Sequence, residues 1–341
     1  TARYALTGTG GAGTSSVALA AGGYTSTTSG VNNTEEWSFS GLPPSTPAVG
    51  YSDAIVGQMY YNSTSGSFKA IKNGGAPIGT WSSGGTMNTA RSDLSAAVFG
   101  PSSAGLGIGG YYPPGSPSAR AITESYNGSS WTEVADLNTG RWIAAGFGTQ
   151  TSAVNSCGCT SDSSNFTAEA ETWNGSSWTA APDVNTTRRS YGASGASSTS
   201  GLMFGGRNVP AYFAVTESWD GSSWTEVGDL NTARAYMAGN GTQTSAVTAS
   251  GLAPSPTTVS ETWNGSSWTE ITELSTARHD ASMFGSGNTD AIISGGAPNP
   301  KALTEYWDGS SWTEVADRAS AMNAGAGSGA SGTNGMTFGG L

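Results

Sequence analysis

One phrase of twelve residues recurs five times along the chain and constrains the fold more than any other feature. Its copies are TESYNGSSWTEV from Thr123, AETWNGSSWTAA from Ala170, TESWDGSSWTEV from Thr216, SETWNGSSWTEI from Ser260 and TEYWDGSSWTEV from Thr304. The second tryptophan position of the phrase is Trp131, Trp178, Trp224, Trp268 and Trp312, at spacings of 47, 46, 44 and 44 residues. This period is typical of a four-stranded propeller blade and too long for a leucine-rich repeat. The sequence therefore predicts an all-β propeller.

Each phrase has the pattern of a β-hairpin. An Asn-Gly or Asp-Gly pair interrupts residues of high strand propensity, and both residues tolerate the positive φ that a two-residue type I′ turn needs. The aromatic residues on either side, such as Trp173 and Trp178, then form a direct or diagonal cross-strand pair worth about 0.5–1 kcal/mol. We expect these tryptophans to be core residues rather than a binding site.

The other two strands of each unit follow a second constant region. This region reads LNTGR at 137–141, VNTTR at 184–188, LNTAR at 230–234 and LSTAR at 274–278. The second strand usually ends in a double glycine, such as Gly205–Gly206, where a Cβ would obstruct a positive φ or the close approach of neighbouring backbone. Units start near residues 1, 89, 139, 186, 232, 276 and 319, and the last has only its first half. We expect a single propeller over 1–341, most simply of seven blades with the last incomplete, and alternatively of six.

A double glycine, a strand with a polar–aromatic pair and then a tryptophan strand together resemble the kelch repeat. The resemblance covers all of the chain except 40–78 and implies a kelch-like β-propeller of four-stranded blades. The chain departs from the kelch pattern at the first aromatic position, where kelch blades usually have tyrosine and only Tyr126 keeps it. The other units have Trp37, Trp173, Trp219, Trp263 and Trp307 there. The departure leaves the fold expected but transfers no detailed kelch function.

Arginine and glutamate each recur at one position of the repeat. The arginines are Arg3, Arg91, Arg141, Arg188, Arg234 and Arg278, and the glutamates are Glu35, Glu124, Glu171, Glu217, Glu261 and Glu305. The incomplete last unit lacks the glutamate and has Met322 in place of the arginine. Because a partly buried charge is costly without a partner, we predict a hydrogen-bonded Glu–Arg pair within or between blades. The alternative is a ring of arginines that forms a central anion site.

Composition narrows the possible partners. The net charge is −11 with only three lysines, so the chain has no basic stripe for phosphates and nucleic acid is not an expected partner. No apolar stretch approaches the roughly 20 residues of a membrane span, so we expect no membrane insertion. Charged residues make up only 11% of the chain, but 12 tryptophans at a fixed period indicate an ordered protein.

The sequence offers little for catalysis. Copper oxidases that resemble galactose oxidase need two histidine ligands, whereas His279 is the one histidine here. Cys157 and Cys159 lack nearby ligands for zinc, and their i, i+2 spacing would strain a disulfide. The segment 218–224 looks like the Asp-box turn of sialidases with one residue missing, but that motif is structural. We therefore expect no enzyme, no cofactor and no metal, with a carbohydrate-active propeller enzyme as the alternative from another class.

The connections between the second and third strands differ from unit to unit, as loops that are free to specialise do. Two of them, 111–121 and 207–214, combine proline with aromatic and cationic residues. The candidate binding residues are Tyr111, Tyr112, Arg120, Arg207, Tyr212 and Phe213. A solvated connector is the other interpretation of these loops.

An insertion at 40–78 contains a hairpin of its own, with strands at 58–62 and 67–71. The stretch GQMYYNSTSGSFKAIKNG in it resembles short β-modules of bacteriophage tail-fibre and virion proteins, and the Ser/Thr/Gly-rich repeats look like virion proteins of marine phages. These resemblances imply a virion or extracellular location and a structural or interaction module that contacts other virion proteins or a host glycan or receptor. A homo-oligomer is compatible with this role. A secreted bacterial adhesin or lectin is the rival among binding proteins.

Overall fold

The computed structural model describes residues 81–112, 119–161 and 165–340, and upstream of them only seven strands. The chain divides into two compact units, Thr1–Gly75 and Ala76–Leu341. No helix in the described part of the chain is long and apolar enough to cross a membrane.

In the first unit, β1 (Gly11–Thr14), β2 (Val17–Ala21) and β5 (Thr34–Ser38) form an antiparallel sheet in the order β1-β2-β5. This is the order expected for the first three strands of a blade. Two hairpins accompany the sheet, β3 (Tyr24–Ser26) with β4 (Ser29–Gly30) and β6 (Met59–Asn62) with β7 (Ser67–Ala70). The β6–β7 pairing confirms the hairpin predicted in the insertion. That this unit forms a blade of the same disc stays a prediction.

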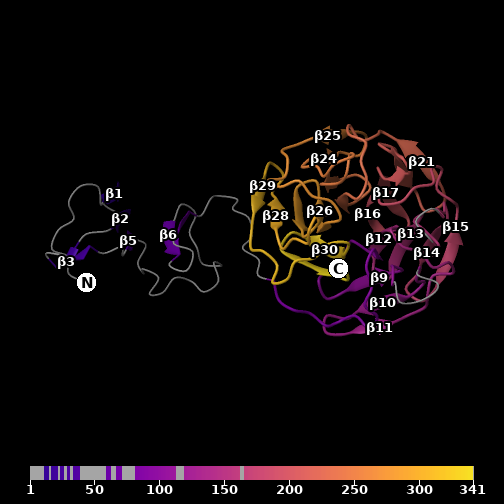
Figure 1. Ribbon diagram of the computed structural model, residues 1–341, viewed down its shortest axis with the longest axis horizontal. Helices are drawn as coiled ribbons and strands as arrows, with labels where there is room; N and C mark the ends of the chain where they lie inside the picture. Colours follow the sequence, from indigo (N-terminus) through magenta and orange to yellow (C-terminus); the bar gives the residue numbers. More distant parts are fainter. Residues whose placement is uncertain are drawn as a thin grey trace. The chain divides into compact units, whose positions relative to one another are not determined.

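The second unit contains five four-stranded antiparallel sheets arranged around a common centre (Figure 1). Blade 1 has β8 (Ser95–Ala96), β9 (Gly105–Ile108), β10 (Thr123–Tyr126) and β11 (Trp131–Glu133). Blade 2 has β12 (Ala145–Thr149), β13 (Ser152–Ser156), β14 (Ala170–Trp173) and β15 (Trp178–Ala181). Blade 3 has β16 (Gly192–Ser197), β17 (Ser200–Phe204), β20 (Thr216–Trp219) and β21 (Trp224–Val227).

Blade 4 has β22 (Ala238–Gly241), β23 (Ala246–Ala249), β24 (Ser260–Trp263) and β25 (Trp268–Glu270). Blade 5 has β26 (Ser282–Gly287), β27 (Asp290–Ser294), β28 (Thr304–Trp307) and β29 (Trp312–Glu314). Two further two-stranded sheets are β18 (Arg207–Asn208) with β19 (Ala211–Tyr212), and β30 (Ala326–Ser331) with β31 (Asn334–Phe338). We call β30 and β31 the half-blade.

The propeller fold predicted from the period is therefore confirmed, but the number of blades differs. The described part of the chain has five four-stranded blades rather than the expected seven or the alternative six. The difference arises at the two ends of the repeat array. The first expected unit falls in Thr1–Gly75, and the last unit contributes only the half-blade.

A ring of backbone hydrogen bonds closes the centre of the disc between residues that lie two positions before each innermost strand. The donor and acceptor residues are, in order, Asp93 to Ala324, Ala324 to Asp280, Asp280 to Tyr236, Tyr236 to Ser190, Ser190 to Ile143 and Ile143 to Asp93, with N–O distances of 2.6–3.1 Å. All six ring residues have a positive φ of 49–57°. Because Ala324 belongs to this ring, the half-blade takes the place between blade 5 and blade 1.

The hairpins of the repeated phrase have a different turn from the one predicted. The loop has four residues, as in Asn127–Ser130, where the Asn127 N–H donates to the Ser130 carbonyl at 3.2 Å and Tyr126 pairs with Trp131. The Asn127 Oδ1 accepts the Ser129 and Ser130 N–H groups, and only Gly128 has a positive φ, of 95°. The two-residue type I′ turn was wrong because the short polar side chain caps the loop by itself.

The repeated tryptophans of the five blades are buried in the core, as predicted, except for the half-buried Trp312. Each pairs directly across its hairpin, with ring centroids 5.3 Å apart for Trp173 and Trp178. Core clusters join neighbouring blades, since Phe147 of blade 2 packs with Met203, Trp219 and Trp224 of blade 3. The double glycines also behave as predicted, because a Cβ on Gly206 would lie 2.9 Å from the Arg189 carbonyl oxygen and φ there is 99°.

Candidate functional site

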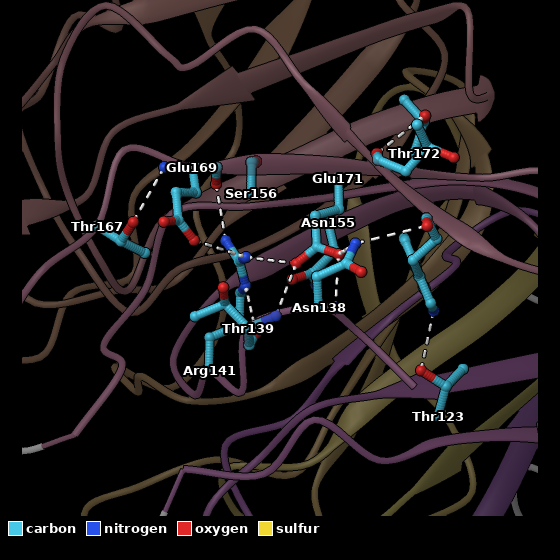
Figure 2. A network of polar contacts seen from close by, with 12 residues as sticks. Thr123, Asn138, Thr139, Arg141, Asn155, Ser156, Thr167, Glu169, Glu171 and Thr172 are labelled. Atoms are coloured by element: carbon cyan, nitrogen blue, oxygen red, sulfur yellow. Dashed lines mark hydrogen bonds and ion pairs between the residues drawn. The ribbon is translucent and has the colours of Figure 1, made fainter. Parts of the chain in front are cut away.

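The repeated arginines and glutamates form buried ion pairs within single blades. Figure 2 shows the pair of blade 2, in which Arg141 Nη2 lies 2.6 Å from Glu171 Oε1. The equivalent pairs are Arg91–Glu124, Arg188–Glu217 at 2.6 Å, Arg234–Glu261 and Arg278–Glu305 at 3.0 Å. The predicted pairing is confirmed for these five, while Arg3 of the sixth expected pair lies outside the described residues. The central anion site is wrong for the five, because each guanidinium is buried against its own carboxylate.

The constant region around each arginine completes a cradle for the carboxylate. In blade 2, Glu171 accepts hydrogen bonds from the Asn138 N–H at 2.8 Å, the Asn138 Nδ2 at 2.7 Å and the Thr139 N–H at 3.3 Å (Figure 2). We call this arrangement the carboxylate cradle. Its hydrogen bonds and ion pair engage the repeated polar residues in the scaffold. A functional site therefore has to come from residues that differ between repeats.

Non-repeated side chains gather on one face of the disc. In an antiparallel blade the second-to-third and fourth-to-first connections leave at the same edge. Isolated bridges join the two kinds of connection, because the residue after the cradle arginine pairs with the residue after the double-glycine position. These bridges are Ser92–Tyr111, Trp142–Cys159, Arg189–Arg207, Ala235–Leu252 and His279–Ala297. The residue types at these positions vary from blade to blade.

Side-chain contacts and backbone bridges together link the residues of this face from one blade to the next. The Tyr111 ring lies 4.7 Å from the Trp142 ring, and Trp142 bridges Cys159, which in turn bridges Phe166. Arg189 lies over the Phe166 ring at 5.1 Å.

The series continues from Arg189 toward the centre of the disc. Arg189 bridges Arg207, whose guanidinium lies 5.9 Å from the centre of the Tyr236 ring, and that ring lies 6.0 Å from the His279 ring. We call these side chains the aromatic–arginine arc: Tyr111, Trp142, Phe166, Arg189, Arg207, Tyr236 and His279.

The six residues expected to bind lie on this face but in two groups. Tyr112 and Arg120 flank one end of the arc, with the guanidinium 5.4 Å from the centre of the ring. Tyr212 lies beside the middle of the arc, where the Arg207 guanidinium is 5.1 Å from the centre of its ring. Tyr111 and Arg207 belong to the arc itself, and the partly buried Phe213 makes no ring contact with it among the described residues. The insertion at 40–78 lies in the other unit except for its last residues, and only β6 and β7 of it are described.

Two aspartates stand beside the arc at the mouth of the central axis. A cavity of about 130 Å³ there is lined by the six ring residues, Asp93 and Asp280 among them. The pKa of Asp93 is raised to about 6, mainly by burial and to a smaller extent by the nearby Asp280 charge, while the Ser92 hydroxyl and Arg189 oppose the rise. Asp280 also lies against the single histidine, with its Oδ2 2.8 Å from His279 Nδ1. The mouth thus combines a carboxyl group that titrates near neutrality with a His–Asp pair.

Sequence reasoning missed Trp142, Phe166, Arg189, Tyr236 and the two aspartates. The available signal was position, because Trp142, Arg189 and His279 all directly follow a cradle arginine. The next residue along is a ring residue, as with Asp93 and Asp280. These variable residues next to an invariant one are recognisable only once the register has been aligned across all repeats.

The described residues contain no group of three or more His, Cys, Asp or Glu side chains that could hold a metal ion. Cys157 and Cys159 are both reduced and buried, and burial raises the pKa of Cys157 to about 11. The buried thiol of Cys157 is therefore a packing group rather than a nucleophile.

Comparison with known proteins supports the fold and nothing finer. No protein-family model matches the chain. No curated protein matches it in sequence. A solved structure described as "Structure of YjhT" is similar with a TM-score of 0.54, over 66% of this chain and 84% of that one, at 12% sequence identity. At this identity the likeness shows the β-propeller fold alone.

Proposed function

We propose that the face carrying the aromatic–arginine arc binds carbohydrate, and that the chain is a non-enzymatic recognition module of a virion-surface or tail-fibre-like protein. The observation that carries the proposal is the arc itself. Flat aromatic rings offer apolar faces to the C–H faces of a sugar, and guanidinium and carboxylate groups beside them offer hydrogen-bond partners for hydroxyl groups. Tyr111, Trp142 and Tyr236 supply the rings, and Arg207 and Asp280 supply partly exposed polar groups.

The proposal also explains why the arc is built from non-repeated residues. A residue that is buried identically in each blade cannot distinguish one ligand from another, whereas a residue that occurs once can. The repeated side chains are committed to the core and to the cradles, as with Trp219 and the Arg188–Glu217 pair. Selectivity for a host glycan therefore depends on the arc and on the loops at 111–121 and 207–214.

The arc is held in place before a ligand arrives. Tyr111 packs on Trp142, Arg207 lies over Tyr212, and Arg189 is buried against Phe166. Side chains that are already ordered cost less conformational entropy on binding, at roughly 0.5–1.5 kcal/mol for each immobilised side chain. This favours ligand recognition over the interpretation of these loops as plain solvated connectors.

The virion setting, with other virion proteins as partners, is supported by the sequence resemblance of the repeats and of the 40–78 insertion to phage proteins. The kelch-like repeat pattern also belongs to this proposal. A secreted adhesin or lectin would use the same face and remains its rival. The experiment below tests the binding face, which both settings share.

A carbohydrate-active enzyme is the second candidate, because of one observation at the mouth. Asp93 has a pKa near 6 and stands in the same ring as the His279–Asp280 pair. A carboxyl group that titrates near neutrality beside a second carboxylate can act as a general acid or base. Mass spectrometry of a glycan after prolonged incubation with the protein distinguishes the candidates. A product formed by the wild type and not by Asp93→Asn would replace the binding function with an enzymatic one.

The direct test is a triple variant, Tyr111→Ala, Tyr112→Ala and Tyr212→Ala, assayed on a glycan array and on host cells. We expect binding to fall at least tenfold while the melting temperature changes by only a few degrees. The matched control replaces Thr179 and Thr225, which are exposed on fourth strands away from the arc, by alanine. Trp224→Ala should do the reverse of the triple variant and lower stability first. Unchanged binding by the triple variant would reject the arc face as the binding site.

A further inference from the structure

Among the described residues, the second strand of the half-blade has an open edge, whereas the second strand of each of the five blades is paired on both sides. In blade 5, β27 pairs with β26 on one side and with β28 on the other. β31 pairs with β30 alone among the described residues. Its residues are also less covered, since β31 is exposed or half-buried up to Thr337 whereas β27 is buried from Ala291 to Ser294.

The fourth-strand position of the half-blade is nevertheless filled, by the segment that begins at Trp81. In blade 3, Trp224 Nε1 donates to the carbonyl of Pro182, four residues after the fourth-strand tryptophan of blade 2. Trp81 Nε1 donates in the same way to Ala316, four residues after Trp312, at 3.1 Å. Trp131 Nε1 then donates to Gly85, four residues after Trp81, at 3.0 Å. Trp81 therefore stands where the tryptophan of a fourth strand belongs.

No described strand takes the third-strand position, and a cavity of about 720 Å³ lies between the segment at Trp81 and β31. The segment 81–85 lines one side of this cavity and β31 lines the other. Tyr126 and Trp131 of blade 1 contribute further lining. A free strand edge beside a cavity that follows the strand is the geometry in which an added peptide strand binds through main-chain hydrogen bonds.

The connection before the half-blade offers donors for a negative charge. In blades 1 to 4, two successive N–H groups donate to the glutamate of the third strand, as Asn231 and Thr232 do to Glu261. The equivalent N–H groups here belong to Ala319 and Ser320, and neither donates to a described residue. The arginine and asparagine side chains of the cradle are absent, since Met322 and Ala319 take their places.

Arg318 supplies a positive charge in the same connection. It takes the place of the apolar residue of the other connections, such as Leu274 in blade 5. Its guanidinium lies 5.5 Å from the Trp81 ring, and its buried Nη1 has no hydrogen-bond partner among the described residues. Burial without a carboxylate lowers the pKa of Arg318. This connection thus holds two N–H groups and a guanidinium nitrogen that make no hydrogen bond to a described residue.

We propose that the gap accepts one extended strand from a partner protein, with a Thr-Glu-x-Trp-like pattern, which completes the blade. The register follows from blade 3, where Phe204 pairs with Thr216, Met203 with Glu217 and Gly201 with Trp219. By the same register the incoming threonine faces Phe338, the glutamate faces Thr337 and the tryptophan faces Gly335. The glutamate then reaches the Ala319 and Ser320 N–H groups, and Arg318 neutralises its charge.

The phrase Thr-Glu-Glu-Trp also occurs in β5 of this chain, but β5 already pairs with β2, with Glu35 opposite Ala20. Its own unit also supplies the cradle arginine in sequence, Arg3. A strand from another protein is therefore the occupant that the structure favours. The test separates it from β5 and from a second copy of this chain.

The probe is a fluorescein-labelled peptide that copies residues 213–220, and the control is the same peptide with Glu217→Gln. Fluorescence anisotropy with the full chain should show at least tenfold tighter binding of the glutamate peptide. Arg318→Leu should weaken its binding to about the level of the control peptide. Met322→Arg, which restores the cradle arginine, should tighten binding of the glutamate peptide and not of the control. Hydrogen exchange of the amides at 334–338 should slow when the peptide binds.

Equal affinity for the two peptides and for a scrambled sequence would overturn the proposal. Strong protection of the amides at 334–338 in the free monomer would also overturn it, because the chain would then fill the gap itself. Dimers that the peptide dissociates would show that a second copy, rather than a partner protein, is the occupant. Since the gap lies apart from the arc, loss of glycan binding in the triple tyrosine variant leaves this result unaffected.

Discussion

The carboxylate cradle of blade 4 allows a quantitative test of how the scaffold is stabilised. Arg234→Met places in blade 4 the residue that the half-blade already has at this position. The substitution leaves the Glu261 carboxylate with three donors, namely the Asn231 N–H at 2.7 Å, the Asn231 Nδ2 at 2.8 Å and the Thr232 N–H at 3.4 Å. Both side chains of the pair are 0% exposed, so water cannot replace the lost guanidinium.

Removal of one partner of a buried ion pair costs about 3–5 kcal/mol, because the other charge stays buried and unpaired. For a unit of this size, 1 kcal/mol shifts the melting temperature by about 2–4 °C, so we expect a loss of about 10 °C. Urea unfolding followed by tryptophan fluorescence measures the free energy directly. The double variant Arg234→Met, Glu261→Gln removes both charges and should recover at least half of the loss.

Glu226→Gln is the matched control. This carboxylate lies on the fourth strand of blade 3, is exposed, and has no ion-pair partner among the described residues. Its free energy of unfolding should stay within about 0.5 kcal/mol of the wild type. A loss below about 1 kcal/mol for Arg234→Met, or a double variant that loses the sum of the two single variants, would refute the coupling between the two charges.

Two further predictions concern the mouth of the axis and the contacts between blades. The pKa of Asp93 is about 6 in the folded protein, against an ordinary value of 3.8, so the folded state holds this proton more tightly than the unfolded state. The protonated carboxyl group therefore contributes its full stabilisation below about pH 4, and this contribution is lost as the pH rises through 6. Asp93→Asn should therefore raise the free energy of unfolding at pH 8 by up to about 3 kcal/mol and change it little at pH 4, as measured by urea titrations at both pH values. Gln243 Nε2 donates to the Trp219 carbonyl at 2.7 Å and to Ser218 Oγ at 2.9 Å of the preceding blade. Gln243→Ala should cost about 1–3 kcal/mol by the same assay, and an unchanged midpoint would contradict a role for this side chain in joining the blades.

The fold and the scaffold charges could be predicted because their signals are periodic. The spacing of Trp131 to Trp312 reports one blade after another, and an arginine that always accompanies a glutamate reports a shared cradle. Each blade has the same local interactions, so a strand assignment that is wrong in one unit is corrected by comparison with the next unit. The direct pairing of Trp173 with Trp178 follows from the same hairpin pattern.

The turn type and the number of blades could not be predicted in the same way. In the turn, a single Asn127 Oδ1 that accepts two N–H groups outweighs the preference of Asn-Gly for a type I′ loop. The blade count depends on which innermost strands close the ring, and that closure joins Asp93 to Ala324 across more than two hundred residues. Nothing local to either residue distinguishes a ring that closes at this point from one that continues.

The candidate site was only partly predictable because its members meet between blades. Tyr111 was singled out for its own loop, but its neighbour Trp142 lies in the next connection and has no unusual local pattern. Asp93 and Asp280 lie almost two hundred residues apart, and each follows a cradle arginine by two positions. Their proximity, and the raised pKa of Asp93 that Asp280 contributes to, exist only once the ring has closed.

The half-blade shows that an arginine occupies the cradle position only where the third strand supplies a carboxylate. A buried guanidinium is stable only beside a carboxylate, and the carboxylate comes from the third strand of the same blade, as Glu305 comes from β28 for Arg278. In the half-blade no described strand takes the third position, so an arginine at the cradle position would be buried without a described partner, and the chain has Met322 there instead. The positive charge stands four residues earlier, at Arg318, whose guanidinium lies 5.5 Å from the centre of the Trp81 ring. Trp81 in turn lines the cavity. Under the proposed strand addition, this charge gains a partner when an acidic strand enters the gap. The same pairing of guanidinium and carboxylate that stabilises the five closed blades would then make the half-blade selective for the strand that completes it.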